Sequence, residues 1–197
     1  MLLRPTQPPN ADQQRVIDRL DRLGTAILDG EGPRGIYLYG AVGRGKTWLC
    51  DQFFEQLPTE SRRRVHFHGF FRQLHREIWN LRLASPADAE RAVERAVASL
   101  LEGSSLLYFD EFHVHDPGDA ALVLRVLDEV LASGVTLLAT SNYAPEDLMP
   151  GPFNHVFQRG IDLIVDTLDV VELEGERDYR RDTRDGVRHG FAAGTWF

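Results

Sequence analysis

Residues 40–47 read Gly40-Ala41-Val42-Gly43-Arg44-Gly45-Lys46-Thr47, and every position agrees with the phosphate-loop pattern G-x-x-x-x-G-K-[ST]. Glycines let such a loop turn so that its backbone N–H groups point at phosphate oxygens, and the following helix presents its positive end. All eight residues are therefore expected to bind a nucleotide, with Lys46 at the β- and γ-phosphates and the Thr47 hydroxyl on Mg²⁺. With this composition, a chance match is expected on the order of 10⁻³ times in the chain.

The pattern around this loop predicts an α/β fold. Short apolar runs alternate with segments of helical spacing, which is typical of a parallel sheet with helices on both faces. The expected strands are 36–39, 65–67, 106–109, 135–139 and 170–173, and the expected helices are 11–29, 46–56, 70–83, 87–101 and 119–131. We therefore predict a three-layer P-loop NTPase core with a parallel five-stranded sheet, and a site at the carboxyl ends of the first, third and fourth strands.

Two carboxylates, Asp110 and Glu111, follow the apolar run 106–109 directly. A buried strand that ends in acidic side chains indicates a cationic neighbour, which in phosphate-loop proteins is Mg²⁺. Asp110 is expected to bind this ion together with Thr47, and Glu111 to act as general base for the attacking water. A solvated acidic turn is the alternative, but a phosphate loop about 60 residues earlier makes it the weaker one. Glu111 favours hydrolysis over passive nucleotide binding.

Two further residues are weaker candidates for a role in catalysis. Asn142 follows the apolar run 135–139 and could orient the attacking water, although Ser-Asn at 141–142 is also common turn chemistry. Arg159 could reach the γ-phosphate of a neighbouring copy as an arginine finger, which would require a homo-oligomer. A solvated surface arginine is the favoured interpretation of Arg159.

Composition disfavours several classes of partner. The 197 residues carry 22 Lys+Arg against 30 Asp+Glu, a formal net charge of −8, and Lys46 is the only lysine. Nucleic acid is disfavoured because binding its phosphates needs a basic face. The run Arg62-Arg63-Arg64 is predicted to be a solvated loop ahead of a strand. No apolar run approaches the length of a membrane span, and the lone Cys50 cannot form an internal disulfide, so we expect a cytoplasmic protein without an intrinsic membrane segment.

Two histidine pairs invite a metal interpretation. His66 with His68, and His113 with His115, would each share one face of an extended segment. No cysteine and no carboxylate at motif spacing accompanies them, so a zinc site is the weaker hypothesis. The tryptophans Trp48 and Trp79 lie at apolar helical positions and are predicted to be core rather than a platform for base stacking.

Five segments together resemble a known family. They are GIYLYGAVGRGKTWLCDQFFEQLP (35–58), RRVHFHGFFRQLHREI (63–78), LLYFDEFHVHDPGDA (106–120), LLATSNYAPEDL (137–148) and ERDYR (176–180). They are similar to the ZapE-type, AFG-one-like ATPases, which are AAA+-related P-loop ATPases implicated in bacterial cell division and mitochondrial protein quality control. The resemblance implies an AAA+-like fold, ATP rather than GTP, and Walker A, Walker B and sensor positions at Lys46, Thr47, Asp110, Glu111 and Asn142.

The chain departs from that family in two places. Members usually continue into a helical lid with a second sensor arginine, whereas this sequence stops at Phe197, and residues 153–156 lack the arginine expected there. The resemblance therefore implies three parts: an N-terminal helix and linker (1–34), the ATPase core (35–175) and a tail or the start of a truncated lid (176–197).

The function expected from all these features is Mg²⁺-dependent binding and hydrolysis of ATP. The resemblance implies that hydrolysis is coupled to remodelling of a protein partner in cell division. Two alternatives stay open: a helicase-loader-like ATPase associated with DNA, and a nucleotide-gated interaction module that does not hydrolyse. Binding of single-stranded DNA would distinguish the first alternative, and phosphate release would distinguish the second.

Overall fold

The computed structural model describes residues 2–84, 90–114 and 116–175. At its centre is a five-stranded sheet in the order β2-β3-β4-β1-β5, and every neighbouring pair of strands is parallel. The strands are β1 (Ile36–Tyr39), β2 (Arg62–His66), β3 (Leu106–Asp110), β4 (Thr136–Ser141) and β5 (Asp169–Glu172). The predicted parallel five-stranded sheet is therefore confirmed.

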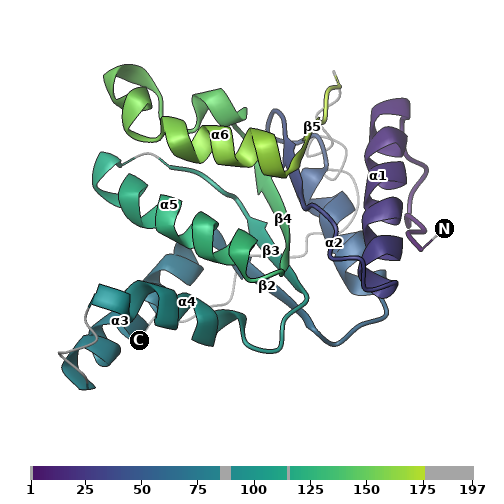
Figure 1. The fold of residues 1–197 in the computed structure, drawn as a ribbon. Helices are drawn as coiled ribbons and strands as arrows, with labels where there is room; N and C mark the ends of the chain where they lie inside the picture. Colours follow the sequence, from purple (N-terminus) through teal and green to yellow (C-terminus); the bar gives the residue numbers. More distant parts are fainter. Residues whose placement is uncertain (1, 85–89, 115, 176–197) are drawn as a thin grey trace, which may run out of the picture.

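Helices cover both faces of the sheet (Figure 1). On one face lie α1 (Ala11–Leu28) and α2 (Lys46–Gln56); on the other lie α3 (Phe67–Ala84), α4 (Ala92–Leu101), α5 (Pro117–Ala132) and α6 (Gln158–Thr167). Successive strand side chains point to opposite faces, so Leu38 packs with α1 and α2 while Tyr37 packs with the other four helices. Two short 3₁₀ helices, η2 (Pro145–Asp147) and η3 (Gly151–Val156), connect β4 to α6. The predicted three-layer arrangement is confirmed.

The N-terminal helix packs against the core rather than standing apart from it. Asn10 caps the start of α1: its side chain accepts a hydrogen bond from the Gln13 N–H at 2.8 Å, while the Gln13 side chain accepts one from the Asn10 N–H at 3.1 Å. Ile17 and Leu20 of the apolar stripe of α1 are fully buried in the cluster shared with α2 and the sheet. This packing brings the start of the chain close to the phosphate loop.

Two predictions that concern the edge strand β2 are wrong. The predicted strand 65–67 is wrong in its bounds, because β2 is Arg62–His66 and α3 already begins at Phe67. The predicted solvated loop at Arg62–Arg64 is also wrong, because these residues pair with residues 106–108 of β3. An edge strand has a neighbour on one side only, and arginine side chains can cross to other elements; Arg62 donates to the Phe54 carbonyl, for example.

The other predicted strands and helices are present and differ from the prediction only at their ends, whereas α6, η2 and η3 were not predicted. The expected helix 87–101 is found as α4 from Ala92, and its residues 87–89 lie outside the described part of the chain. The predicted C-terminal part, 176–197, also lies outside it, so the three-part division of the chain stays a prediction. Within the residues that the structure describes, no helix is both long enough and apolar enough to cross a membrane.

Candidate functional site

The phosphate loop joins β1 to α2 with a backbone that only glycine adopts easily. Gly40, Gly43 and Gly45 have φ angles of 149°, 84° and 94°. Gly40 also needs space, because a Cβ there would lie 2.5 Å from the Leu173 carbonyl oxygen. α2 then begins at Lys46, so the loop ends at the positive end of a helix.

Lys46 lies at the centre of the loop with only 7% of its surface exposed. Its ammonium group donates to the carbonyl oxygens of Gly40 at 2.7 Å and Ala41 at 3.0 Å, and to Asn142 Oδ1 at 3.0 Å. The structure thus brings Asn142, at the end of β4, to the phosphate-loop lysine. The sequence placed both residues at strand ends, and the order of β1 beside β4 makes them neighbours.

Asp110 is buried at the end of β3, and both of its carboxylate oxygens accept hydrogen bonds. Oδ1 accepts from the hydroxyls of Thr47 at 3.2 Å and Thr140 at 2.8 Å, and Oδ2 accepts from Arg64 Nη2 at 2.9 Å. Burial alone would raise the pKa of the Asp110 carboxyl, but the bonds from Arg64, Thr140 and Thr47 outweigh it and hold that pKa below its usual value. Asp110 is therefore an ionised carboxylate, and with Thr47 it offers the hard oxygen ligands that Mg²⁺ prefers.

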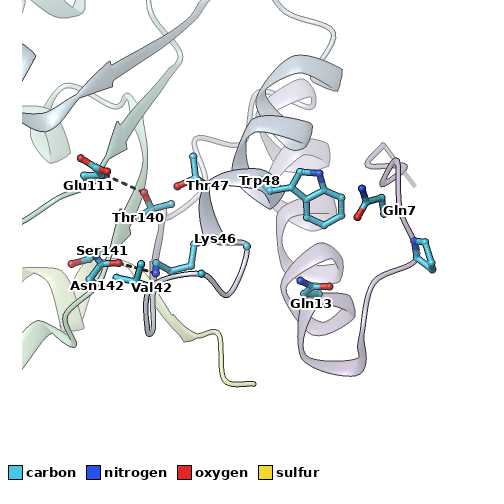
Figure 2. A pocket seen from close by; sticks show the side chains of 13 residues that line it. Gln7, Gln13, Val42, Lys46, Thr47, Trp48, Glu111, Thr140, Ser141 and Asn142 are labelled. Carbon is cyan, nitrogen blue, oxygen red and sulfur yellow. Dashed lines mark hydrogen bonds between the residues drawn. The ribbon is translucent and has the colours of Figure 1, made fainter. Parts of the chain in front are cut away.

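Glu111 has a backbone conformation that is unusual for a residue with a side chain. It is the one residue other than glycine with positive φ, at 59°, in the described part of the chain. Its N–H donates to Thr140 Oγ1 at 3.3 Å, and its carbonyl oxygen lies 2.6 Å from His113 Nδ1. A carbonyl oxygen can only accept, so Nδ1 carries the hydrogen. This turn directs the Glu111 side chain towards the cavity that the phosphate loop lines (Figure 2).

The predicted histidine pairs do not form as expected. His68 lies in α3, not in an extended segment, and its Nε2 is 2.9 Å from Nε2 of His113. His115 lies outside the described residues. Among the residues described, no three His, Cys, Asp or Glu side chains form a group able to hold a metal ion. The interpretation of these histidines as structure around the site stays a prediction.

These side chains surround one cavity of about 390 Å³ at the carboxyl ends of β1, β3 and β4 (Figure 2). The predicted residues lining it are Val42, Gly43, Gly45, Lys46, Thr47, Glu111 and Asn142, and those the sequence analysis did not identify as site residues are Gln7, Pro8, Gln13, Trp48, Thr140 and Ser141. Four of the predicted nucleotide and Mg²⁺ ligands do not line the cavity: Gly40, Ala41, Arg44 and Asp110. Asp110 is hydrogen-bonded to Thr47, which does line it, and the Arg44 carbonyl accepts from the Gln13 side chain at 3.2 Å.

Trp48 and Trp79 differ from the prediction that both are core. Trp48 is half-buried and lines the cavity at the side opposite Glu111, near Gln7 (Figure 2), whereas Trp79 is 64% exposed on α3. Trp48 could have been suspected from the sequence, because it directly follows Thr47 in the first turn of α2. Nothing in the sequence marks Gln7 or Pro8 as site residues, because their position at the cavity depends on how the chain before α1 folds back.

Arg159 does not line this cavity. It lies in α6, and its Nη2 is 3.2 Å from Asp128 Oδ2 on α5, an ion pair in which Arg159 is largely exposed and Asp128 partly so. Within one chain it therefore follows the favoured interpretation of a surface arginine. A role at the site of a neighbouring copy stays a prediction.

Comparison with known proteins agrees with this geometry. The family model described as AFG1-like ATPase matches residues 6–192. The cell division protein ZapE of Escherichia coli (strain K12) is 38% identical over 148 residues, which are 75% of this chain and 38% of that protein. Lactation elevated protein 1 homolog B of Danio rerio is 32% identical over 158 residues, 75% of this chain and 31% of that protein. The chain thus spans less than two-fifths of the length of these relatives.

Solved structures show the same fold at low sequence identity. DnaI has a TM-score of 0.63 at 17% identity, over 89% of this chain and 88% of that one. Domain III of the Thermotoga maritima replication initiation protein DnaA has a TM-score of 0.59 at 15% identity, over 93% and 73%. At such identities the likeness concerns the P-loop fold alone, whereas the family match covers nearly the whole chain. The chain belongs to the AFG1-like ATPase family.

Proposed function

We propose that this chain binds ATP with Mg²⁺ in the cavity at the phosphate loop and hydrolyses it. The observation that carries the proposal is that Lys46, Thr47 and Glu111, from two separate segments, line one cavity, and that Asp110 is hydrogen-bonded to Thr47 beside it. The membership in the AFG1-like ATPase family supports the same activity.

The chain's own residues divide the work of binding. Lys46 would exchange its bonds to the two loop carbonyls for bonds to the β- and γ-phosphate oxygens, where the helix dipole adds to its charge. Thr47 and Asp110 would hold Mg²⁺, since their oxygens already lie 3.2 Å apart at the edge of the cavity. When bound there, the ion neutralises charge on the phosphates.

Glu111 and Asn142 would act on the attacking water. The Glu111 carboxylate is a general base that takes a proton as the water attacks the γ-phosphate. Asn142, bonded to Lys46 at 3.0 Å, is placed to orient the water or to contact the γ-phosphate. Neither role requires a large movement of the strand ends.

Two substitutions test binding and hydrolysis separately. Lys46→Ala should weaken binding of a fluorescent ATP analogue by about two orders of magnitude, because a buried charged donor is lost. Glu111→Gln should leave binding intact and reduce phosphate release by about 10²- to 10⁴-fold. Glu102→Gln, on an exposed residue after α4, is the matched control. Unchanged phosphate release in Glu111→Gln, or none in the unaltered chain, would refute hydrolysis and favour a nucleotide-gated module.

We further propose that hydrolysis drives remodelling of a protein partner, in cell division. This part rests on family membership and on the Escherichia coli relative, which is named a cell division protein. Deletion of the gene in its own organism should lengthen the cells, with rescue by the unaltered gene and not by Lys46→Ala. Normal cell length after deletion would contradict the division role, and salt-sensitive binding of single-stranded DNA would favour the helicase-loader alternative.

An arginine finger from a neighbouring copy is a third proposal. Arg159 and Asp128 form an exposed ion pair, which is weak enough to exchange for a phosphate. The ATPase rate per chain should then rise with protein concentration, and Arg159→Ala should abolish the rise while Arg19→Ala retains it. A flat rate for the unaltered chain would exclude the finger.

A further inference from the structure

Arg64 connects the candidate Mg²⁺ ligand Asp110 to a second carboxylate that lies outside the cavity. It projects from β2, and its Nη2 is 2.9 Å from Asp110 Oδ2 while its Nη1 is 3.0 Å from Asp51 Oδ1 on α2. Its guanidinium carbon also lies 5.2 Å from the centre of the Tyr108 ring. One planar fork thus joins three elements of the fold, a contact that a lysine with its single nitrogen could not make in the same way.

The contact fixes the orientation of Asp110. Arg64 occupies Oδ2, so Oδ1 is the oxygen that faces Thr47 and Thr140. A carboxylate held at only one oxygen could rotate about its last bond, whereas one held at both keeps the same oxygen towards Thr47. Asp110 is therefore preorganised for a ligand on the Thr47 side.

The contact between Arg64 and Asp110 also changes the charge around Asp110. Arg64 alone would neutralise Asp110, and a neutral pair attracts a divalent cation less than a free carboxylate does. Asp51 supplies a further negative charge to the same guanidinium, so the three side chains together keep a net charge of −1. Arg64 orients Asp110 but weakens its attraction for a cation, and the negative charge of Asp51 offsets that loss.

We propose that Arg64 and Asp51 are positioning residues that set the affinity of the nucleotide site for Mg²⁺, Arg64 by orienting Asp110 and Asp51 by balancing the charge of Arg64. This inference rests on the proposed function, since it assumes that the cavity binds ATP with Mg²⁺. It concerns the dependence on Mg²⁺ and not the affinity for the nucleotide alone, and this difference makes it testable.

The test measures binding of a fluorescent ATP analogue to the full chain while Mg²⁺ is titrated, and separately in EDTA. Asp51→Asn keeps the size of the side chain and removes its charge. It should raise the Mg²⁺ concentration at half-saturation about three- to tenfold, a moderate effect because Asp51 is partly exposed, and leave affinity in EDTA unchanged. Arg64→Met frees Asp110 to rotate but also removes a positive charge, so a raised Mg²⁺ midpoint that Arg64→Lys partly recovers supports the orienting role, and an unchanged or lowered midpoint overturns it.

Arg19→Met provides the matched control. It breaks an ion pair of similar exposure with Asp169, away from the cavity, and should leave the Mg²⁺ midpoint unchanged. An Asp51→Asn midpoint within twofold of the unaltered chain would overturn the inference, as would an equal loss of affinity in EDTA, which would indicate a structural role. Absent phosphate release from the unaltered chain would refute hydrolysis without affecting this titration, so the two failures are distinguishable.

Discussion

The Glu111→Gly variant is expected to be more stable than the Glu111→Ala variant, although both lack the candidate general base. Glu111 has φ of 59°, in the left-handed region where a Cβ meets the following carbonyl. Glutamate and alanine both carry that Cβ, and glycine does not. Comparison of Glu111→Gly with Glu111→Ala therefore isolates the backbone strain from the loss of the carboxylate.

Two opposing free energies set the magnitude. Relief of the left-handed conformation is worth about 1–2 kcal/mol, and the larger conformational freedom of glycine in the unfolded chain costs about 0.5–1 kcal/mol. The glycine variant should thus be more stable than the alanine variant by about 0.5–1 kcal/mol. For a chain of this length, this difference raises the unfolding midpoint by about 1–4 °C.

Glu102 is a suitable control position. It is also exposed, but its φ is −51°, so glycine relieves no strain there and should be less stable than alanine by about 0.5–1 kcal/mol. Urea unfolding followed by circular dichroism gives all four free energies of unfolding. The order of glycine and alanine should reverse between the two positions. If Glu111→Ala is as stable as Glu111→Gly, the strain at this turn is absent and the reasoning fails.

Three further outcomes are expected from single substitutions. Trp48 lines the cavity and Trp79 is exposed, so ATP should change the intrinsic tryptophan fluorescence of the unaltered chain. A Trp79→Phe variant should keep this change, and a Trp48→Phe variant should lose most of it. Gly160→Ala would place a Cβ 2.4 Å from the Phe157 ring and should lower the free energy of unfolding by about 1–3 kcal/mol in urea titrations. His113→Ala should slow phosphate release with unchanged ATP binding, because the Glu111 carbonyl loses the hydrogen bond from His113. His113→Asn, whose amide can reach the same carbonyl, should restore the rate. Equal rates in both variants would contradict this role.

The sequence predicted well the parts of the fold that one local pattern determines. β1 and α2 have the predicted bounds, because the phosphate loop between them matches a motif that fixes a strand before it and a helix after it. The ends of β3 and β4 were predicted to meet at the site, since the carboxyl ends of parallel strands lie at one edge of a sheet. Lys46 and Asn142 accordingly line one cavity, and Asp110 is hydrogen-bonded to Thr47 beside them.

What the sequence did not reveal depends on contacts between distant segments. The arginines of β2 look like a loop because they are charged, and only the position of β2 at the sheet edge explains why a strand tolerates them. The pairing of His68 with His113 joins α3 to the turn after β3, and no spacing within one segment predicts it. The approach of Gln7 to the cavity likewise depends on the fold of the chain before α1.

Lys46 and Arg64 show how the site uses its two kinds of basic side chain. The Lys46 ammonium donates to three oxygens around a single nitrogen in a buried position, a geometry that also suits phosphate oxygens and that a planar guanidinium would not fit. Arg64 contacts its two carboxylates through different nitrogens, Asp51 through Nη1 and Asp110 through Nη2, and so holds them apart while it binds both. In a chain with 22 basic residues and one lysine, the lysine stands where a compact charge is needed, and an arginine stands where two carboxylates must share one cation. The division follows from the shapes of the two groups, since both carry the same charge.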